Sequence, residues 1–260
     1  MAEIGSEVFS GELMPDLSSQ YRVGKYLGSG TNDSAYLVND NNLQSFVALT
    51  PNLYPSPEAN WQRTKHKLEK AAVLDKMGLA YHVVHPIAKG LLPLRQASSS
   101  TDMALVVEYA GEPIETAQSE SEKLEILKQV WQVTKTIHEN GYAINDFKDE
   151  HWLFQNSNGG LQVKLIDYTQ LSTVSPESME RNRNDHRKGD MRKFWYLAAS
   201  FFPWFKPEAV PTFSTETAKV IQKEIDQMLV DLGEQSHRFT PKQKIAKALI
   251  GKLRTRLKGI

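Results

Sequence analysis

The sequence predicts an α+β protein built as two lobes, with an antiparallel sheet and one helix in the first lobe and mainly helices in the second. Short segments rich in Val, Tyr, Phe and Leu dominate the first part, whereas helical periodicity dominates the second. The length of 260 residues, 40% of them hydrophobic, suffices to bury one large core or two smaller ones. We expect the lobes to span residues 1–110 and 111–260.

Three antiparallel strands and one helix are expected in the first lobe. Glycine or Asn/Asp turns separate the strands, which is typical of hairpins. The helix runs from about Ala59 to Met77 and stops at Gly78, because glycine commonly ends helices. A buried strand, MALVVEYAG, follows and ends in a turn. The three strands are YRVGKYLGSG, SAYLVND and QSFVALT.

A long amphipathic helix is expected near the start of the second lobe. From Ser119 to Glu139, apolar side chains recur at intervals of three and four residues. An apolar strand, QVKLIDY, follows a turn at residues 156–160 and forms a hairpin with the preceding segment. From Asp190 onward, the pattern predicts helices.

Composition excludes several classes of protein. Thirty-one basic residues balance thirty-one acidic ones, so no overall field attracts nucleic acid, and no nucleic-acid partner is expected. The absence of cysteine excludes disulfides and thiolate metal sites. The sequence shows neither a secretory signal nor an apolar run of the roughly 20 residues that span a bilayer. We therefore expect a soluble, cytoplasmic protein.

A stretch that follows the long helix, GYAINDFKDEHWLF at Gly141 to Phe154, holds candidate catalytic groups. Asp146 precedes a strand, and Asp167, 21 residues later, ends the next strand, so a hairpin brings both carboxylates to one edge. Two such acids can hold a divalent metal and accept a hydroxyl proton, the two tasks of phosphoryl transfer. Alternatively, they are a helix cap and a turn residue, because aspartate favours both positions.

A glycine pair, Gly28 and Gly30, lies between the first two predicted strands in LGSGTNDSAYLV. Without side chains there, backbone amides can approach a phosphate. Glycine turns between strands are common, so the pair alone is a weak indication of phosphate binding.

Taken together, these segments occur in the order found in protein kinases. IHENGYAINDFKDEHWLF resembles the kinase sequence that leads from LHxxG into HRDxKxxN, and LIDY resembles the strand that ends in DFG. The resemblance implies that Asp146 is the catalytic aspartate and that Lys148 offsets charge on the transferring group. It also implies that Asp167 binds metal and that His151 stands at the position of the metal-binding asparagine.

The resemblance also implies nucleotide-binding residues. LVVEYAG resembles the kinase hinge, whose backbone would hold adenine, and the glycine segment would cover the phosphates of ATP. Ser175-Pro176-Glu177 resembles the APE motif, and Asp190 follows where kinases carry an aspartate that braces the catalytic loop. The implied nucleotide-binding residues are Gly28, Ser29, Gly30, Thr31, Glu108, Tyr109 and Ala110.

The histidine narrows the family. NDFKDEHWLF and LIDYTQ resemble the HRDFxxxHFLL and IDLHR blocks of the lipopolysaccharide core kinases, bacterial enzymes that phosphorylate inner-core sugars with ATP. This resemblance implies ATP and Mg²⁺ as cofactors and a sugar hydroxyl as acceptor, with a small molecule or a protein serine as the next choices. His151 is then either a metal ligand or a core histidine that bonds to a backbone carbonyl.

Several positions depart from the kinase pattern. Thr50 replaces the phosphate-pairing lysine of VAIK, and Asp33 replaces the third loop glycine, which places an acid near anionic phosphates unless a metal or lysine offsets it. Glu69, on the predicted helix, is the nearest match to the glutamate that pairs with that lysine. The segment from Asp167 to Glu177 is shorter than a usual activation segment, and Asn145 replaces the arginine of HRD. Candidates for the missing cation are Lys25, Lys65 and Lys67.

These departures leave other functions open. A pseudokinase would keep the fold as a binding or regulatory module without the chemistry, and Thr50 and Asp33 favour this alternative. Retention of Asp146 and Asp167 favours an enzyme. A kinase-like enzyme that transfers AMP instead of phosphate is a third alternative, because a rearranged phosphate grip can turn the α-phosphate toward the acceptor.

The C-terminal tail is basic and amphipathic. Leucine and isoleucine recur about every four residues after Pro241. Eight lysines and arginines, and no acid, follow Glu234. Such a helix can lie on anionic lipid, which would place the protein peripherally on the inner face of the membrane. Alternatively, it is a last helix packed on the second lobe with its lysines in water.

Overall fold

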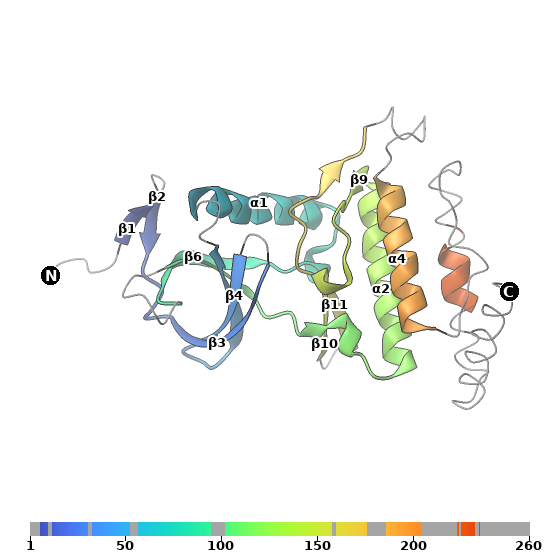
Figure 1. Cartoon of the computed structure of the whole chain (residues 1–260), viewed down its shortest axis with the longest axis horizontal. Helices are drawn as coiled ribbons and strands as arrows, with labels where there is room; N and C mark the ends of the chain where they lie inside the picture. Colours follow the sequence, from blue (N-terminus) through green and yellow to red (C-terminus); the bar gives the residue numbers. More distant parts are fainter. Residues whose placement is uncertain are drawn as a thin grey trace, which may run out of the picture. The chain divides into compact units, whose positions relative to one another are not determined.

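The computed structural model describes the chain in segments, and its residues form two compact units. One unit comprises Met1–Ala110 with Asp167–Thr169, and the other comprises Gly111–Ile166 with Gln170–Ile260. Figure 1 shows the helices and strands of both units, coloured along the sequence. The described residues are 6–9, 12–30, 33–52, 57–94, 102–157, 160–175, 186–203, 223, 225–231 and 234.

The first unit contains a five-stranded antiparallel sheet with the strand order β3-β4-β5-β7-β6. The three predicted strands and MALVVEYAG are confirmed as β3, β4, β5 and β7, so the predicted α+β class with an antiparallel sheet is correct. The bounds are β3 (Tyr21–Ser29), β4 (Asp33–Asp40), β5 (Ser45–Pro51), β6 (Pro86–Leu92) and β7 (Asp102–Glu108).

Sequence reasoning missed the edge strand β6 and a hairpin of two short strands, β1 (Ser6–Phe9) and β2 (Glu12–Pro15). The sequence of β6, PIAKGLL, contains proline, lysine and glycine, which are depleted in strands. Pairing with β7 along its length overrides this weak propensity. Gly90 is required within β6, because a Cβ there would overlap the carbonyl oxygen of Pro15 and the side chain of Leu17.

One hydrophobic cluster of the first unit is built on alternate residues of this sheet. Residues that alternate along the strands meet there, as a half-buried sheet requires. Tyr21 and Phe46 meet edge to face with ring centroids 5.7 Å apart. The buried members are Leu17, Tyr21, Val38, Ala48, Leu92, Leu94, Ala104 and Val106.

Helix α1 (Pro57–Lys76) matches the predicted helix to within two residues at either end and packs against β5. Gly78, two residues after the last residue of the helix, has a φ of 79°, which suits glycine. The amide of Leu79 donates to the carbonyl of Leu74 at 3.1 Å, which satisfies a terminal carbonyl of the helix. A short 3-10 turn, η1 (Ala80–His82), then leads into β6.

In the second unit, helices α2 (Glu120–Glu139) and α4 (Arg187–Phe201) lie side by side (Figure 1). Trp131 and Phe194 pack between them, with ring centroids 5.2 Å apart. Ser119 caps α2 in a reciprocal pair with Glu122, whose amide donates to the serine hydroxyl. Helix α2 is therefore confirmed, whereas α4 begins three residues before the predicted start at Asp190.

Short strands complete the second unit. The antiparallel hairpin of β10 (Trp152–Ser157) and β11 (Gly160–Leu165) confirms the predicted one, and β8 (Glu112–Pro113) pairs with its edge. β9 (Tyr142–Ala143) pairs with β12 (Ser172–Thr173). Two 3-10 turns, η2 (Ile114–Thr116) and η3 (Asp149–His151), lie between these elements.

Among the helices of the described segments, none is both long and apolar enough to cross a membrane. The predicted basic helix after Pro241 lies outside the described residues. Its predicted contact with anionic lipid therefore stays a prediction. Of the APE-like segment, Pro176 and Glu177 also lie outside them.

Candidate active site

The candidate catalytic loop, residues 144–151, is held by one buried aspartate. Asp190, in the first turn of α4, is only 1% exposed. Its carboxylate accepts hydrogen bonds from the amide of Ile144 at 2.7 Å, the amide of Asn145 at 3.1 Å and Nε2 of His138 at 3.0 Å. The expected bracing role of Asp190 is confirmed, and His138 belongs to the same network.

Asn145 fixes the next part of the loop, a role that sequence reasoning missed. Its φ of 64° is in the left-handed region, which asparagine tolerates better than most residues. Its side-chain amide donates to the carbonyl of Gln170 at 2.8 Å and to the hydroxyl of Ser172 at 2.7 Å. The residue that replaces the arginine of HRD therefore shapes the backbone immediately before Asp146. The asparagine itself could have indicated this role, because asparagine is enriched at positive φ and this one directly precedes the candidate catalytic acid.

Asp167 is positioned by the hairpin that follows the loop. Trp152 pairs with Leu165, and the amide of Ile166 donates to the carbonyl of His151 at 2.9 Å, so the chain leaves β11 beside η3. Asp167 is the next residue. Its Oδ1 accepts hydrogen bonds from the amide and the hydroxyl of Thr169, at 3.1 and 2.7 Å, which orients the carboxylate.

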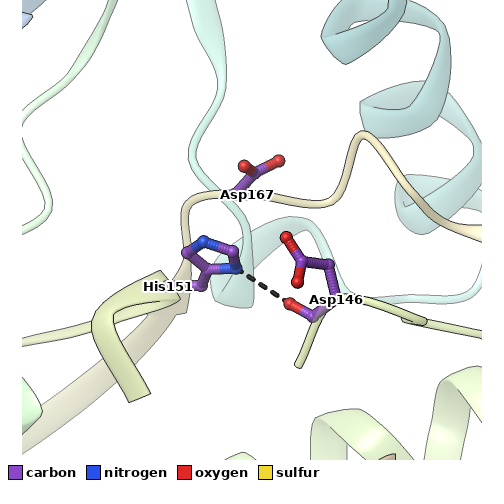
Figure 2. A group of neighbouring side chains, drawn as sticks. All are labelled: Asp146, His151 and Asp167. Atoms are coloured by element: carbon purple, nitrogen blue, oxygen red, sulfur yellow. Dashed lines mark hydrogen bonds between the residues drawn. The ribbon is translucent and has the colours of Figure 1, made fainter. Parts of the chain in front are cut away.

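Asp146, His151 and Asp167 form one cluster, drawn in Figure 2. One candidate ligand atom from each residue lies within 4.8 Å of the others. The histidine is buried, and the two aspartates are half-buried. Nδ1 of His151 lies 2.9 Å from the carbonyl oxygen of Asp146. Because a carbonyl only accepts, Nδ1 is the donor in this contact.

The cluster fits a divalent metal ion by its donor chemistry. Carboxylate oxygens suit Mg²⁺ and Mn²⁺, whereas an imidazole nitrogen suits Mn²⁺ better than Mg²⁺. The hydrogen bond from Nδ1 to a carbonyl is the orienting contact that metal-binding histidines commonly make. The bond to a backbone carbonyl agrees with the core-histidine alternative for His151, and the role of metal ligand stays a prediction.

Lys148 lies beside the catalytic candidate. Its Nζ is 3.1 Å from Oδ2 of Asp146, and the two side chains are 47% and 38% exposed. At this exposure the ion pair adds little stability. It places a positive charge next to the carboxylate that was predicted to receive a hydroxyl proton.

Two groups near the cluster have shifted pKa values. Burial, together with repulsion by Asp75, raises the pKa of Tyr168, whose hydroxyl donates to the carbonyl of Val84 at 2.6 Å. Burial, with repulsion by Glu115, also raises the pKa of Asp149, in η3. Tyr168 follows Asp167 directly, so its bond to Val84 anchors the segment Asp167–Thr169 to the first unit.

The glycine turn, Gly28 to Gly30, has open space in front of it, since a Cβ at Gly28 would meet no atom within 4 Å. The amide of Gly30, however, donates to the carbonyl of Asp33 at 2.9 Å. The carbonyl of Gly30 accepts a hydrogen bond from the side-chain amide of Asn52 at 2.8 Å. Ser29 is exposed at the end of β3, and Thr31 lies outside the described residues. The predicted phosphate cover therefore has one amide already in use.

Lys67, on α1, offsets the charge of Asp33 at the turn, which is one of the two ways that the sequence analysis considered. Nζ of Lys67 lies 3.1 Å from Oδ2 of Asp33, and the two side chains are only 12% and 11% exposed. Lys25, by contrast, is exposed on β3. The third candidate, Lys65, has a side chain outside the described part of the chain. Thr50 is 1% exposed on β5.

The expected partner role of Glu69 differs from what the structure shows. Glu69 is 73% exposed and its Oε2 lies 3.0 Å from Nδ1 of His66, one turn away on α1. The ion pair between this helix and the sheet is made instead by Lys67 and Asp33, with the charges exchanged between helix and strand. Periodicity alone could not reveal this, because one helix face holds several charged residues.

The hinge candidates Glu108, Tyr109 and Ala110 follow directly from β7. The amide of Glu108 donates to the carbonyl of His85 at 3.2 Å, and its carboxylate accepts from the amide of His85 at 2.9 Å. The segment is thus fixed to the residue before β6.

Neither protein-family models nor curated proteins give a match to this chain. The likeness to lipopolysaccharide core kinases therefore remains an expectation from short motifs. Of the four residues that carry it in the catalytic segment, Asp146, His151 and Asp167 share a cluster, and Lys148 pairs with one member of that cluster.

Proposed function

We propose that the protein is an ATP-dependent phosphotransferase with a two-lobed, protein-kinase-like fold, which moves the γ-phosphoryl group to a hydroxyl. The observation that carries the proposal is the cluster of Asp146, His151 and Asp167. Two carboxylates and an imidazole, held by a braced loop and a hairpin, provide both a proton acceptor and a metal-binding group. Following the sequence resemblance, the acceptor class is a lipopolysaccharide-type sugar, with a small molecule or protein serine next.

The reaction assigns one task to each side chain. The acceptor oxygen forms a bond to the γ-phosphorus while the bond from that phosphorus to the bridging oxygen breaks, which releases ADP. Asp146 takes the hydroxyl proton, and Lys148 offsets charge on the transferring group. Asp167 and His151 would hold the divalent ion, which when bound neutralises charge on the phosphate oxygens.

ATP binding measured by calorimetry, with and without Mg²⁺, tests this proposal. We expect wild type to bind ATP in a metal-dependent manner and Asp167→Asn to lose the metal-dependent part, a weakening of about tenfold or more. Asp146→Asn should still bind ATP, because its proposed task is proton transfer. Mn²⁺ should support binding at a lower concentration than Mg²⁺, because one proposed ligand is a nitrogen.

Glu150→Gln is the matched control. Glu150 is an exposed acid next to His151 that does not belong to the cluster. We expect its ATP affinity to stay within about twofold of wild type, since exposed single charges contribute little. Equal losses in Glu150→Gln and Asp167→Asn would show a general charge effect and contradict a specific metal site.

A pseudokinase is the second candidate function. Thr50 is buried where a kinase lysine was expected, and the amide of Gly30 is engaged inside the turn. Absence of ATP binding at every metal concentration would favour this function over the enzyme. If ATP is bound, mass measurement of the acceptor distinguishes phosphate transfer from AMP transfer.

A further inference from the structure

The ion pair of Lys67 and Asp33 lies at the glycine turn. Asp33 is the first residue of β4, and its carbonyl accepts the amide of Gly30. The ammonium of Lys67, 3.1 Å from the carboxylate of the same residue, is therefore held beside the turn by α1. Lys67 and Asp33 are 34 residues apart in sequence but meet within the first unit.

The same pair lies beside the position of the absent lysine. In the register of β4 with β5, Ser34 is opposite Thr50 and Asp33 is opposite Pro51. A charge bound to Asp33 thus lies at the same end of these two strands as residue 50. Thr50 itself is buried and carries no charge to offer.

The ion pair of Lys67 and Asp33 is not explained by a gain in folding stability alone. Both side chains are nearly nine-tenths removed from water, and the desolvation cost of such a pair commonly offsets its Coulombic gain. The amide of Gly30 is used within the turn, so a phosphate there needs a positive side chain. Lysine is a point charge suited to phosphate oxygens.

From these observations we infer that Lys67 is the cation that binds the nucleotide phosphates and that Asp33 competes with the phosphates for it. The inference rests on the proposed nucleotide-binding function. The carboxylate of Asp33 would also repel the phosphates. Removing the charge of Lys67 should therefore weaken ATP binding, whereas removing the charge of Asp33 should strengthen it.

Calorimetry with ATP and Mg²⁺ on Lys67→Met and Asp33→Asn tests the inference. We expect Lys67→Met to weaken ATP binding about tenfold or more, because hydrogen bonds to charged groups contribute strongly. Asp33→Asn should bind ATP about threefold more tightly, since repulsion of the phosphates falls. Affinity for adenosine, a phosphate-free probe, should stay unchanged in both. Lys76→Met, at an exposed lysine in the last turn of α1, is the control and should match wild type.

The result that would overturn the inference is equal weakening of ATP binding by both variants, as a merely structural pair predicts, or no change in Lys67→Met. If wild type binds ATP through Asp167 and Lys67→Met binds equally well, the inference fails while the proposed function stands. If wild type binds no ATP, both fail.

Lys67→Met leaves a buried carboxylate without this partner, so its folding is checked by thermal unfolding. If it does not fold, Lys67→Met/Asp33→Asn replaces it, because neither charge of the pair remains. Compared with Asp33→Asn, which differs from it only at residue 67, the double variant should bind ATP about tenfold more weakly. Equal affinity of these two variants would also overturn the inference.

Discussion

The catalytic loop and the glycine turn are held by different kinds of contact. In the loop, buried Asp190 accepts hydrogen bonds from three donors, and the loop sequence keeps Asp146 and Lys148 of the kinase pattern. The turn is held by Asn52 and by the ion pair of Lys67 and Asp33, where the sequence departs from that pattern. The difference teaches that the proposed catalytic groups rest on a buried frame, whereas the proposed phosphate grip depends on a few charged and polar contacts nearer the surface.

Removing the buried brace should have the largest effect on stability. In Asp190→Ala, the amides of Ile144 and Asn145 and the ring of His138 lose their acceptor in a buried place. We expect a loss of about 3 kcal/mol or more in the free energy of unfolding. Urea denaturation measures this, with Glu139→Gln, an exposed acid at the end of α2, as the near-neutral control. A loss below about 1 kcal/mol would show that the loop does not depend on the brace.

Two asparagines allow a direct comparison of the regions. Asn145→Ala removes two side-chain hydrogen bonds and leaves alanine at a positive φ, so we expect a loss of about 2 kcal/mol. Asn52→Ala removes the side-chain contacts to Gly30 and Ser34 but leaves no alanine at a positive φ, so we expect a smaller loss of about 1 kcal/mol. Denaturation of both variants checks the order, and the reverse order would contradict the contrast between the two regions.

Tyr168 gives a smaller effect that depends on pH. Its pKa in the folded protein lies above the ordinary value near 10, because burial disfavours the phenolate. The folded state therefore holds the phenolic proton more tightly, so this contribution to stability is complete below about pH 10 and is lost as pH rises further. Tyr168→Phe should lose about 1 kcal/mol at pH 7, because the carbonyl of Val84 loses its donor.

The pH dependence is checked by measuring unfolding from about pH 8 to about pH 11.5, a range that includes the ordinary tyrosine pKa of about 10. The stability of Tyr168→Phe should fall less steeply with pH than that of wild type. Identical slopes would contradict a buried, protonated Tyr168. The control is Tyr81→Phe, at a tyrosine that is 78% exposed, and it should keep the slope of wild type.

Local patterns accounted for much of the fold but not for the contacts that complete the site. Hydrophobic periodicity and turn residues predicted the helices α1 and α2 and the strands β3, β4, β5 and β7. The motif order indicated Asp146, His151 and Asp167, and hairpin geometry explains why the chain brings them together. Edge strand β6 was missed because its propensity is weak and its pairing partner decides its conformation.

The remaining site contacts join residues distant in sequence. Asp33 and Lys67, or His138 and Asp190, meet only through tertiary packing, and a single sequence carries no periodic signal for such pairs. Several lysines were equally suitable candidates for the missing cation. The exposed position of Lys25 and the buried contact of Lys67 distinguish two of them, and Glu69 turned out to face water.

The central claim, that His151 and Asp167 hold a catalytic divalent ion beside Asp146, is tested most directly by pulsed electron paramagnetic resonance of bound Mn²⁺. If the claim is correct, the Mn²⁺ signal of wild type shows coupling to an imidazole nitrogen, and His151→Gln abolishes this coupling. Asp167→Asn should also weaken Mn²⁺ binding by about tenfold or more. An unchanged nitrogen coupling in His151→Gln, or Mn²⁺ binding that does not respond to Asp167→Asn, would contradict the claim.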